Sequence, residues 1–386
     1  MRVYEKSHPW LTFSVNLKQV LFDSWIKLGE CQSKCEHIRD APILPDTAKE
    51  LFQLYLAKGV LATTAIEGNT LTEKQVIEHL EGKLRLLPSR EYQAREIDNI
   101  VKACNEILDV IKNKATPLLD VKNIKTLNQK ILEGLPVAPH VIPGELRKVS
   151  VGVSGYRGAP ADDCEYLLER LCVWLNGPGF EAPNPGMVFV FAIIKAVMAH
   201  LYIAWIHPFG DGNGRTARLI EFITLISSGV PATAAHLLSN HYNQTRTRYY
   251  HELARASESN GDIIPFLNYA IQGLLDGLRE QVESIQKQQW KVVWRDFIYR
   301  TVKGKSTLSK ERKQKLVFAI SNEERPMSVR EIAELPKVVR LYPGLALNTL
   351  KRDIHELTKE GLLVKDKDKI IAHFEAISGF KNIVAI

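Results

Sequence analysis

A run of twenty almost entirely apolar residues, 187–206, constrains the fold of this chain more than any other feature. The run is long enough to cross a bilayer. Lys195 and His200 lie inside it, however, and charge in the middle of a membrane is costly. A second apolar segment, 219–226, follows after a short glycine-rich loop. We therefore expect 187–206 to be a helix buried on all sides within a helical bundle, and we expect no membrane association.

The loop between the two apolar segments carries residues suited to binding phosphates. It reads His207-Pro208-Phe209-Gly210-Asp211-Gly212-Asn213-Gly214-Arg215-Thr216-Ala217-Arg218. Backbone N–H groups of Gly212, Asn213 and Gly214, at the start of the following helix, would form a cradle for an anion. Arg215 and Arg218 are three positions apart on that helix, so both guanidinium groups should reach the same side and grip phosphates.

Two further residues of the loop point to catalysis. Asp211 offers a carboxylate oxygen of the kind that magnesium takes alongside substrate phosphates. His207 stands at the start of the loop, and a side chain with a near-neutral pKa is suited to removing a hydroxyl proton. The loop matches the signature of the Fic family, His-Pro-Phe-x-(Asp/Glu)-Gly-Asn-Gly-Arg-x-x-Arg, at every specified position. With residue frequencies of about 5% each, a chance match at nine positions is negligible, and the chain therefore resembles that family.

The resemblance implies a mainly α fold, a Fic-type helical bundle with a short β-hairpin flap. It also implies a protein adenylyltransferase that uses ATP and Mg²⁺ (or Mn²⁺), with the metal held by Asp211. His207 would deprotonate a Ser, Thr or Tyr hydroxyl of a target protein, and that oxygen would attack the α-phosphorus. AMP is then transferred and pyrophosphate leaves. Most of the rate should come from positioning and preset positive charge.

An inhibitory element is expected near the start of the chain. The segment Thr63-x-x-x-Glu67-Gly68 resembles the inhibitory motif of many Fic proteins. A glutamate brought to Arg218 would neutralise the cation that should orient the terminal phosphate of ATP. The alternative interpretation is an ordinary helix end, with Gly68 as the C-cap and Thr72 capping the next helix.

The glycine-rich segment 143–160 interrupts the helical pattern. Alternating valines, including Val149 and Val151, indicate a short hairpin. In Fic proteins the corresponding hairpin, the flap, holds the target segment by strand addition, which supplies affinity through the backbone. We therefore expect Val149, Ser150, Val151 and Gly152 to bind the target, whereas the alternative is a plain connector.

Aromatic residues follow the signature at Tyr249 and Tyr250. They resemble the Fic segment that lines the adenine end of the nucleotide pocket, where a planar ring can stack on the base. Core packing is the competing explanation.

The end of the chain indicates a separate small domain. Ser328 and Glu331 form a capping box before a short helix, a second helix spans 349–360, and 362–372 suggests a hairpin with a charged turn. This order resembles the winged helix-turn-helix fold. From residue 291 onward, 20 Lys and Arg stand against 12 Asp and Glu, so the chain's net charge of +7 comes from this region.

The basic residues of this region could contact DNA phosphates; they are Lys351, Arg352, Lys365, Lys367 and Lys369. Two alternatives remain. The domain could dock another protein or a second copy of the chain, giving a homodimer, or the charges could form a solvated face.

The sequence thus predicts three regions: residues 1–90 with the inhibitory motif, 91–302 as the Fic catalytic domain, and 308–386 as the winged helix-like domain. The first residues lack the apolar core of a signal peptide, so we expect a cytoplasmic protein. Besides AMP transfer, three functions stay open: a Fic enzyme moving a different phosphate-containing group, a DNA-binding regulator that senses nucleotide, and an adaptor with an inactive catalytic domain.

Overall fold

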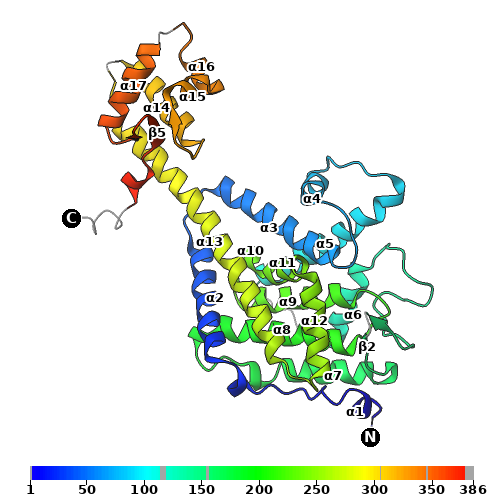
Figure 1. Ribbon diagram of the computed structural model, residues 1–386. Coiled ribbons are helices and arrows are strands. Elements are labelled where there is room, and N and C mark those ends of the chain that lie inside the picture. The colour runs from blue at the N-terminus through cyan, green and yellow to red at the C-terminus, as the bar shows by residue number, and fades with distance from the viewer. Residues whose placement is uncertain (1, 114–118, 154–155, 305, 345–346, 379–386) are drawn as a thin grey trace. The chain divides into compact units, whose positions relative to one another are not determined.

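The computed structural model describes residues 2–113, 119–153, 156–304, 306–344 and 347–378 (Figure 1). The hairpin positions Ser154 and Gly155 lie outside these residues. Within the described residues the chain is mainly helical, as predicted, with two small antiparallel sheets.

The chain divides into two compact units, Met1–Ile285 and Gln286–Ile386. This division differs from the predicted ranges at two places. Residues 1–90 contribute to the same hydrophobic core as the rest of the first unit, and the boundary falls inside a helix rather than after it.

The first unit is built mainly from helices. Its α-helices are α1 Tyr4–Ser7, α2 Phe22–Asp40, α3 Pro45–Ala65, α4 Glu73–Leu80, α5 Glu91–Lys112, α6 Val121–Ile131, α7 Cys164–Leu175, α8 Val188–Ile206, α9 Asn213–Ser227, α10 Ala232–Ala235, α11 Leu237–Gln244, α12 Arg246–Glu258 and the first part of α13 Ile264–Thr301. Its 3-10 helices are η1 Leu17–Gln19, η2 Pro88–Arg90, η3 Ala161–Asp163, η4 Pro178–Phe180 and η5 Pro185–Met187. Its only described strands, β1 Gly152–Val153 and β2 Tyr156–Arg157, pair antiparallel.

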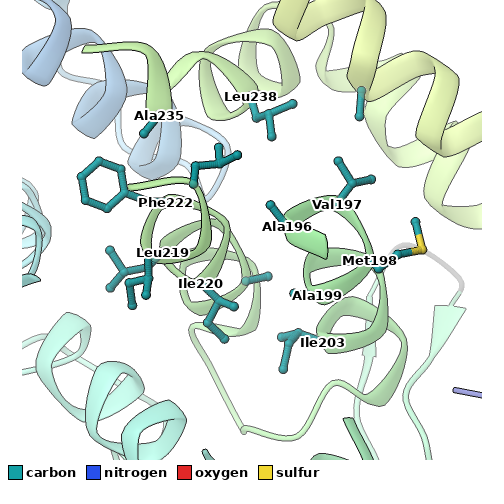
Figure 2. Packing of buried hydrophobic residues seen from close by; sticks show 14 of the residues in the cluster. Ala196, Val197, Met198, Ala199, Ile203, Leu219, Ile220, Phe222, Ala235 and Leu238 are labelled. Atoms are coloured by element: carbon teal, nitrogen blue, oxygen red, sulfur yellow. The ribbon is translucent and has the colours of Figure 1, made fainter. Parts of the chain in front are cut away.

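The buried helix predicted from the long apolar run is α8, which packs most extensively against α9. Figure 2 shows the packing between them, where Ala196, Ala199 and Ile203 lie on the side of α8 that faces α9, and Ile220 lies between the two helices. Among the described residues, Pro185–Ile206 is the one helix long and apolar enough to span a membrane, and 72% of its most apolar window is buried inside the protein. The core therefore fixes both helices that flank the signature loop.

Helix α13 is one continuous helix, Ile264–Thr301. The residues just before the boundary between the two units are Glu283, Ser284 and Ile285, and none of them is a glycine or proline that would end a helix. Ile285 is buried in the core of the first unit.

The second unit contains the rest of α13 and a small set of further elements. These are α14 Thr307–Ser321, β3 Met327–Ser328, α15 Val329–Glu334, α16 Pro336–Leu341, α17 Leu347–Lys359, β4 Leu363–Asp366, β5 Lys369–Ala372 and η6 Phe374–Ile377. The strands form an antiparallel sheet in the order β3-β5-β4, with Lys365 opposite Ile370. The predicted capping box of Ser328 and Glu331 is present at the start of α15, and the unit has its own core around Leu316, Met327 and Ile370.

Candidate active site

His207 is held in an uncommon backbone conformation directly after α8. Its φ of 50° and ψ of 57° lie in the left-handed region, which is unfavourable for a residue with a Cβ. Its N–H donates to Ile203 O at 2.9 Å, and its carbonyl oxygen accepts from Arg147 Nε at 2.6 Å. Its ring Nδ1 lies 3.3 Å from Ala204 O. These contacts turn the chain sharply out of the helix and aim the imidazole into a cavity.

Burial lowers the pKa of His207 to about 4, although the Ala204 carbonyl and the carboxylates of Glu67 and Asp211 act in the opposite direction. The pKa of His207 therefore lies below the near-neutral value expected from the sequence, although the residue as a whole is half-buried. At neutral pH the imidazole is uncharged and can accept a proton.

The side chain of Asn213 closes the signature loop. Its Oδ1 accepts from Phe209 N and its Nδ2 donates to Phe209 O, both at 2.9 Å. Asn128 of α6 supports the same loop from outside, because its Nδ2 donates to Asp211 O at 2.9 Å while its Oδ1 accepts from Gly144 N at 3.0 Å. The sequence analysis used only the backbone of Asn213 and missed Asn128, which lies far away in the sequence.

Arg215 does not lie where the sequence analysis placed it. It lines no part of the cavity that contains His207. Its Nη1 donates to Glu96 Oε1 of α5 at 2.7 Å, and its Nη2 donates to Asp211 Oδ1 at 3.0 Å. Burial raises the pKa of Glu96 even though Arg215 is its ion-pair partner. Arg215 is therefore paired with two carboxylates, and its contact with phosphate stays a prediction.

Asp211 remains suited to holding a metal. Its contacts with Arg215 and with Gly212 N both use Oδ1, and its side chain is 43% exposed. Magnesium commonly takes one or two carboxylates and completes its shell with water and substrate phosphates. Among the described residues there is no group of three His, Cys, Asp or Glu that could hold a metal alone. The donor set therefore fits an ion that arrives with a phosphate-bearing substrate.

Arg218 forms an ion pair with Glu67. The distance from Arg218 Nη2 to Glu67 Oε1 is 2.5 Å, and Arg218 Nε and Nη2 also donate to Thr63 Oγ1 and Thr63 O at 2.8 and 3.0 Å. The Arg218 side chain is 1% exposed and that of Glu67 is 28% exposed. Burial alone would raise the pKa of Glu67, but the charges of Arg218 and Arg215 outweigh it and lower that pKa.

Glu67 lies in a turn that directly follows a helix end, since the C-cap of α3 is Ile66 and not Gly68 as the alternative interpretation had it. Gly68 has a φ of 104° just beyond the end of α3, and Thr72 forms a capping box with Gln75 at the start of α4. The helix end and the contact with Arg218 therefore coexist. A Cβ at Gly214 would come within 2.3 Å of Glu67 Oε1, so the glycine of the signature leaves room for the carboxylate.

Apart from Arg215, the predicted catalytic, nucleotide-binding and inhibitory residues meet around a cavity of about 240 Å³. It is lined by Glu67, Tyr156, Ala204, His207, Gly210, Asp211, Gly212, Asn213, Gly214, Arg218, Tyr249, Tyr250, Leu253 and Ala254. A larger cavity of about 850 Å³ in the first unit is lined by none of the signature residues. The candidate site is therefore identified by the chemical groups that line it and not by its size. Tyr249 is 2% exposed and stacks on Tyr242, so it belongs both to the core and to the cavity wall.

The hairpin beside this cavity is shorter than predicted. Of the expected target-binding residues Val149, Ser150, Val151 and Gly152, only Gly152 belongs to strand β1. The preceding segment is held by other contacts, because Arg147 Nη1 donates to Val149 O at 2.8 Å and Gly158 N donates to Val151 O at 3.1 Å.

Arg147 is a further residue that the sequence analysis missed. It is buried and binds the carbonyls of Val149, Ala159, Ile206 and His207, and so ties the hairpin to the end of α8. Tyr156 of β2 reaches the cavity from the same hairpin, and its hydroxyl donates to Trp205 O at 2.8 Å.

Comparison with known proteins shows what the part of the chain around this site is similar to. Residues 118–225 match the Fic/DOC family. The protein adenylyltransferase Fic of Drosophila ananassae is 31% identical over 210 residues, which are 54% of this chain and 38% of that protein. The Drosophila melanogaster protein of the same name matches with the same identity and coverage.

Solved structures share the fold. A Fic family protein from Desulfovibrio desulfuricans G20 aligns with a TM-score of 0.57 at 19% identity, covering 92% of this chain and 97% of that one. Fic-1 (residues 134–508) from C. elegans aligns with a TM-score of 0.54 at 22% identity, covering 69% and 73%.

The architecture is thus that of a Fic-fold protein, as the signature predicted. Residues 118–225 are a Fic domain, which contains the signature loop 207–218. It spans less than two fifths of the length of the Drosophila relatives.

Proposed function

We propose that this chain is a protein adenylyltransferase that moves AMP from ATP to a Ser, Thr or Tyr hydroxyl of a target protein. The observation that carries the proposal is the single cavity shared by His207, the Gly212–Gly214 turn and Arg218. The N-terminus of α9 and the buried guanidinium of Arg218 favour phosphate binding at one end of this cavity. The neutral imidazole of His207 lines the same cavity. The relatives named protein adenylyltransferase Fic support the same reaction class.

The residues of the cavity have separate tasks in this reaction. The phosphates are bound and oriented by N–H groups at the start of α9 and by the guanidinium of Arg218. Asp211 is the residue that would hold Mg²⁺ (or Mn²⁺), which neutralises phosphate charge when bound. His207 accepts the proton of the target hydroxyl. That oxygen forms a bond to the α-phosphorus while the bond from the α-phosphorus to the bridging oxygen of the β-phosphate breaks, and pyrophosphate leaves. Positioning and preset charge supply most of the rate.

The proposal includes autoinhibition by Glu67. Its carboxylate lies on Arg218, the only cation among the residues that line the cavity, so a nucleotide must compete with it for that guanidinium. A carboxylate and a terminal phosphate both prefer the same charged donor, and only one of them can take Arg218 Nη2 in this geometry.

The target segment would bind along the hairpin of β1 and β2 and the preceding residues 149–151. Strand addition uses main-chain hydrogen bonds and needs an unpaired edge. Val149 and Ser150 are exposed and lie outside the paired strands, and Tyr156 of the same hairpin faces the cavity. A target bound there would present its hydroxyl near His207.

The experiment that tests the proposal uses the Glu67→Gly protein, ATP labelled at the α-phosphate and cell extract. Label should appear on protein bands and should disappear with His207→Ala in the same background. Mass spectrometry of the labelled bands should show an added AMP. A phosphate or phosphocholine adduct, or an absence of any adduct, contradicts the proposal.

A second function, DNA binding by the second unit, is favoured by exposed basic residues. Lys351 and Arg352 near the start of α17 and Lys365, Lys367 and Lys369 around the β4–β5 turn are all exposed. Phosphate contacts of this kind give affinity that falls steeply with salt. A shift assay with duplex DNA at several salt concentrations, comparing the parent with Lys351→Gln/Arg352→Gln, tests it. Equal binding by both proteins contradicts DNA contact through α17.

A further inference from the structure

The outer edge of strand β2, the edge away from β1, is occupied by a histidine side chain. The two strands pair in a register that places Gly152 opposite Arg157. The neighbouring pair is hydrogen-bonded, since Gly158 N donates to Val151 O at 3.1 Å. Because the backbone groups of successive residues point to opposite edges of a strand, the carbonyl of Arg157 faces away from β1. His8 Nε2 lies 2.9 Å from that carbonyl oxygen.

The imidazole of His8 is a fixed part of the fold. His8 is only 5% exposed, although the hairpin residue that it binds is exposed. A carbonyl oxygen can only accept, so Nε2 carries the proton of this bond. The other ring nitrogen, Nδ1, lies 2.9 Å from Ser7 Oγ, and the ring meets that of Tyr156 edge-on with centroids 6.1 Å apart. Burial lowers the pKa of His8, so the ring is neutral at neutral pH.

The segment that carries His8 is anchored on both sides of it. Tyr4 N donates to Asp163 Oδ2 at 2.8 Å, and Asp163 is a buried residue of η3, which follows the hairpin. Phe13 N donates to the hydroxyl of Tyr202 in α8 at 3.1 Å. We call residues 4–13 the clamp. A short two-stranded hairpin has little stability of its own, so support from the clamp bears directly on where β2 lies.

The outer edge of β1 is placed differently. By the same alternation, the N–H and C=O of Gly152 face away from β2, and Gly152 is exposed. An extended segment that adds to a sheet needs such outward-facing groups. On β2 the outward carbonyl of Arg157 is already bound by His8. Strand addition by a target is therefore directed to β1, while Tyr156 of β2 lines the cavity.

We propose that His8 is a positioning residue for the target, which closes the outer edge of β2 and holds the hairpin beside the cavity so that the target adds to β1. This inference rests on the proposed adenylyltransferase function and deepens its account of target binding. His8 does not line the cavity and acts only through the hairpin. Its loss should loosen the hairpin and weaken target capture, while ATP affinity stays the same.

The test compares His8→Ala with its parent, both in the Glu67→Gly background. The hairpin segment 149–158 should exchange its amide hydrogens roughly three- to tenfold faster, the size expected for one hydrogen bond. The extract concentration that gives half-maximal incorporation of α-labelled AMP should rise by roughly the same factor. ATP affinity, measured by calorimetry, should change by less than about twofold because the nucleotide groups are untouched.

Two further variants at the same position separate the hydrogen bond from the space that the ring fills. The side-chain amide of His8→Gln can reach the position of Nε2 and donate, whereas that of His8→Asn reaches only as far as Nδ1. His8→Gln should therefore restore parental exchange and incorporation to within about twofold, and His8→Asn should behave as His8→Ala does. Thermal melting shows whether each variant is folded. If His8→Ala does not fold, the comparison of the glutamine and asparagine variants carries the test.

The matched control is Ser14→Ala, which removes a polar group just beyond the clamp. The Ser14 hydroxyl is exposed and lies 2.9 Å from Thr12 Oγ1, away from the hairpin contact of His8. All three measurements should remain at their parental values in this variant.

The outcomes separate the positioning role from the proposed function. Unchanged exchange in His8→Ala, or equal behaviour of His8→Gln and His8→Asn, overturns the clamp and leaves the adenylyltransferase intact. Faster exchange with unchanged incorporation overturns the role in target capture, and a matching loss of ATP affinity would assign His8 to the nucleotide instead. If the Glu67→Gly parent itself incorporates no AMP, the proposed function fails and the role of His8 in it fails as well.

Discussion

Replacing Glu67 with glycine should make the protein faster and less stable at the same time. The contact that is lost is a charge-assisted hydrogen bond of 2.5 Å to a guanidinium that is 1% exposed. Such bonds contribute about 1.5–3 kcal/mol. If ATP must break this bond to reach Arg218, its removal should raise kcat/KM for AMP transfer by roughly 10- to 150-fold, since about 1.4 kcal/mol corresponds to a factor of ten.

The stability of the first unit should move in the opposite direction. Removing one partner of a buried ion pair leaves an uncompensated charge and is destabilising. The cost is reduced here because the Glu67 side chain is 28% exposed and Thr63 still accepts from Arg218. We expect a loss of about 1–2 kcal/mol, which lowers Tm by roughly 2–8 °C. Saturating ATP should recover part of this loss, because a ligand that binds the folded state stabilises it.

The assay combines α-labelled ATP incorporation with thermal melting for Glu67→Gly, Glu67→Gln and the parent. Glu67→Gln keeps the size of the side chain and removes the charge, so it should produce most of the gain if charge competition is the cause. An unchanged transfer rate in both variants, with a lowered Tm, would refute the reasoning. It would show that the ion pair stabilises the fold and does not restrain the reaction.

Three further predictions concern the signature loop. His207→Ala should abolish AMP transfer, whereas ATP affinity, measured by calorimetry in the Glu67→Gly background, should change by less than about threefold. A loss of ATP binding would show instead that the imidazole binds the nucleotide. The pKa of His207 is about 4, and the general base must be unprotonated. The value of kcat/KM should therefore stay level from about pH 8 down to about pH 5 and fall at lower pH. A fall of kcat/KM to half its maximum near pH 6.5 would contradict a buried, neutral imidazole. Arg147→Met should lower Tm by several degrees and reduce AMP transfer at least tenfold. The substitution removes the guanidinium that donates to the carbonyl oxygens of Val149, Ile206 and His207. AMP transfer at the parental rate would show that the hairpin is held without Arg147.

The sequence predicted those parts of the site that depend on short spacing. The loop after the long apolar run, the helix that starts at the glycine turn and the position of Arg218 all follow from residues within one segment. Glu67 was also predicted, but only because a second motif could be recognised beside the first. Its distance from Arg218 could not be inferred from spacing, since Glu67 lies in the turn after α3 and Arg218 lies in α9.

The parts that could not be predicted depend on tertiary partners. Arg215 is turned from the cavity by Glu96, which lies more than a hundred residues earlier in the chain. Asn128 and Arg147 act through backbone carbonyls and amides, which carry no signature in a sequence. The segment before strand β1 is likewise bound by Arg147, through the carbonyl oxygen of Val149.

The position of Glu67 bears on how inhibition could be relieved. The carboxylate does not stand on α3 itself, because the helix ends at Ala65 and Glu67 belongs to the turn that follows. Thr63, by contrast, is inside the helix and is 6% exposed. A change in the turn, or in the side chain alone, can therefore withdraw the carboxylate while Thr63 keeps its hold on Arg218. If the proposed inhibition is correct, activation needs only a local rearrangement, and the bundle that supports the signature loop can remain folded throughout.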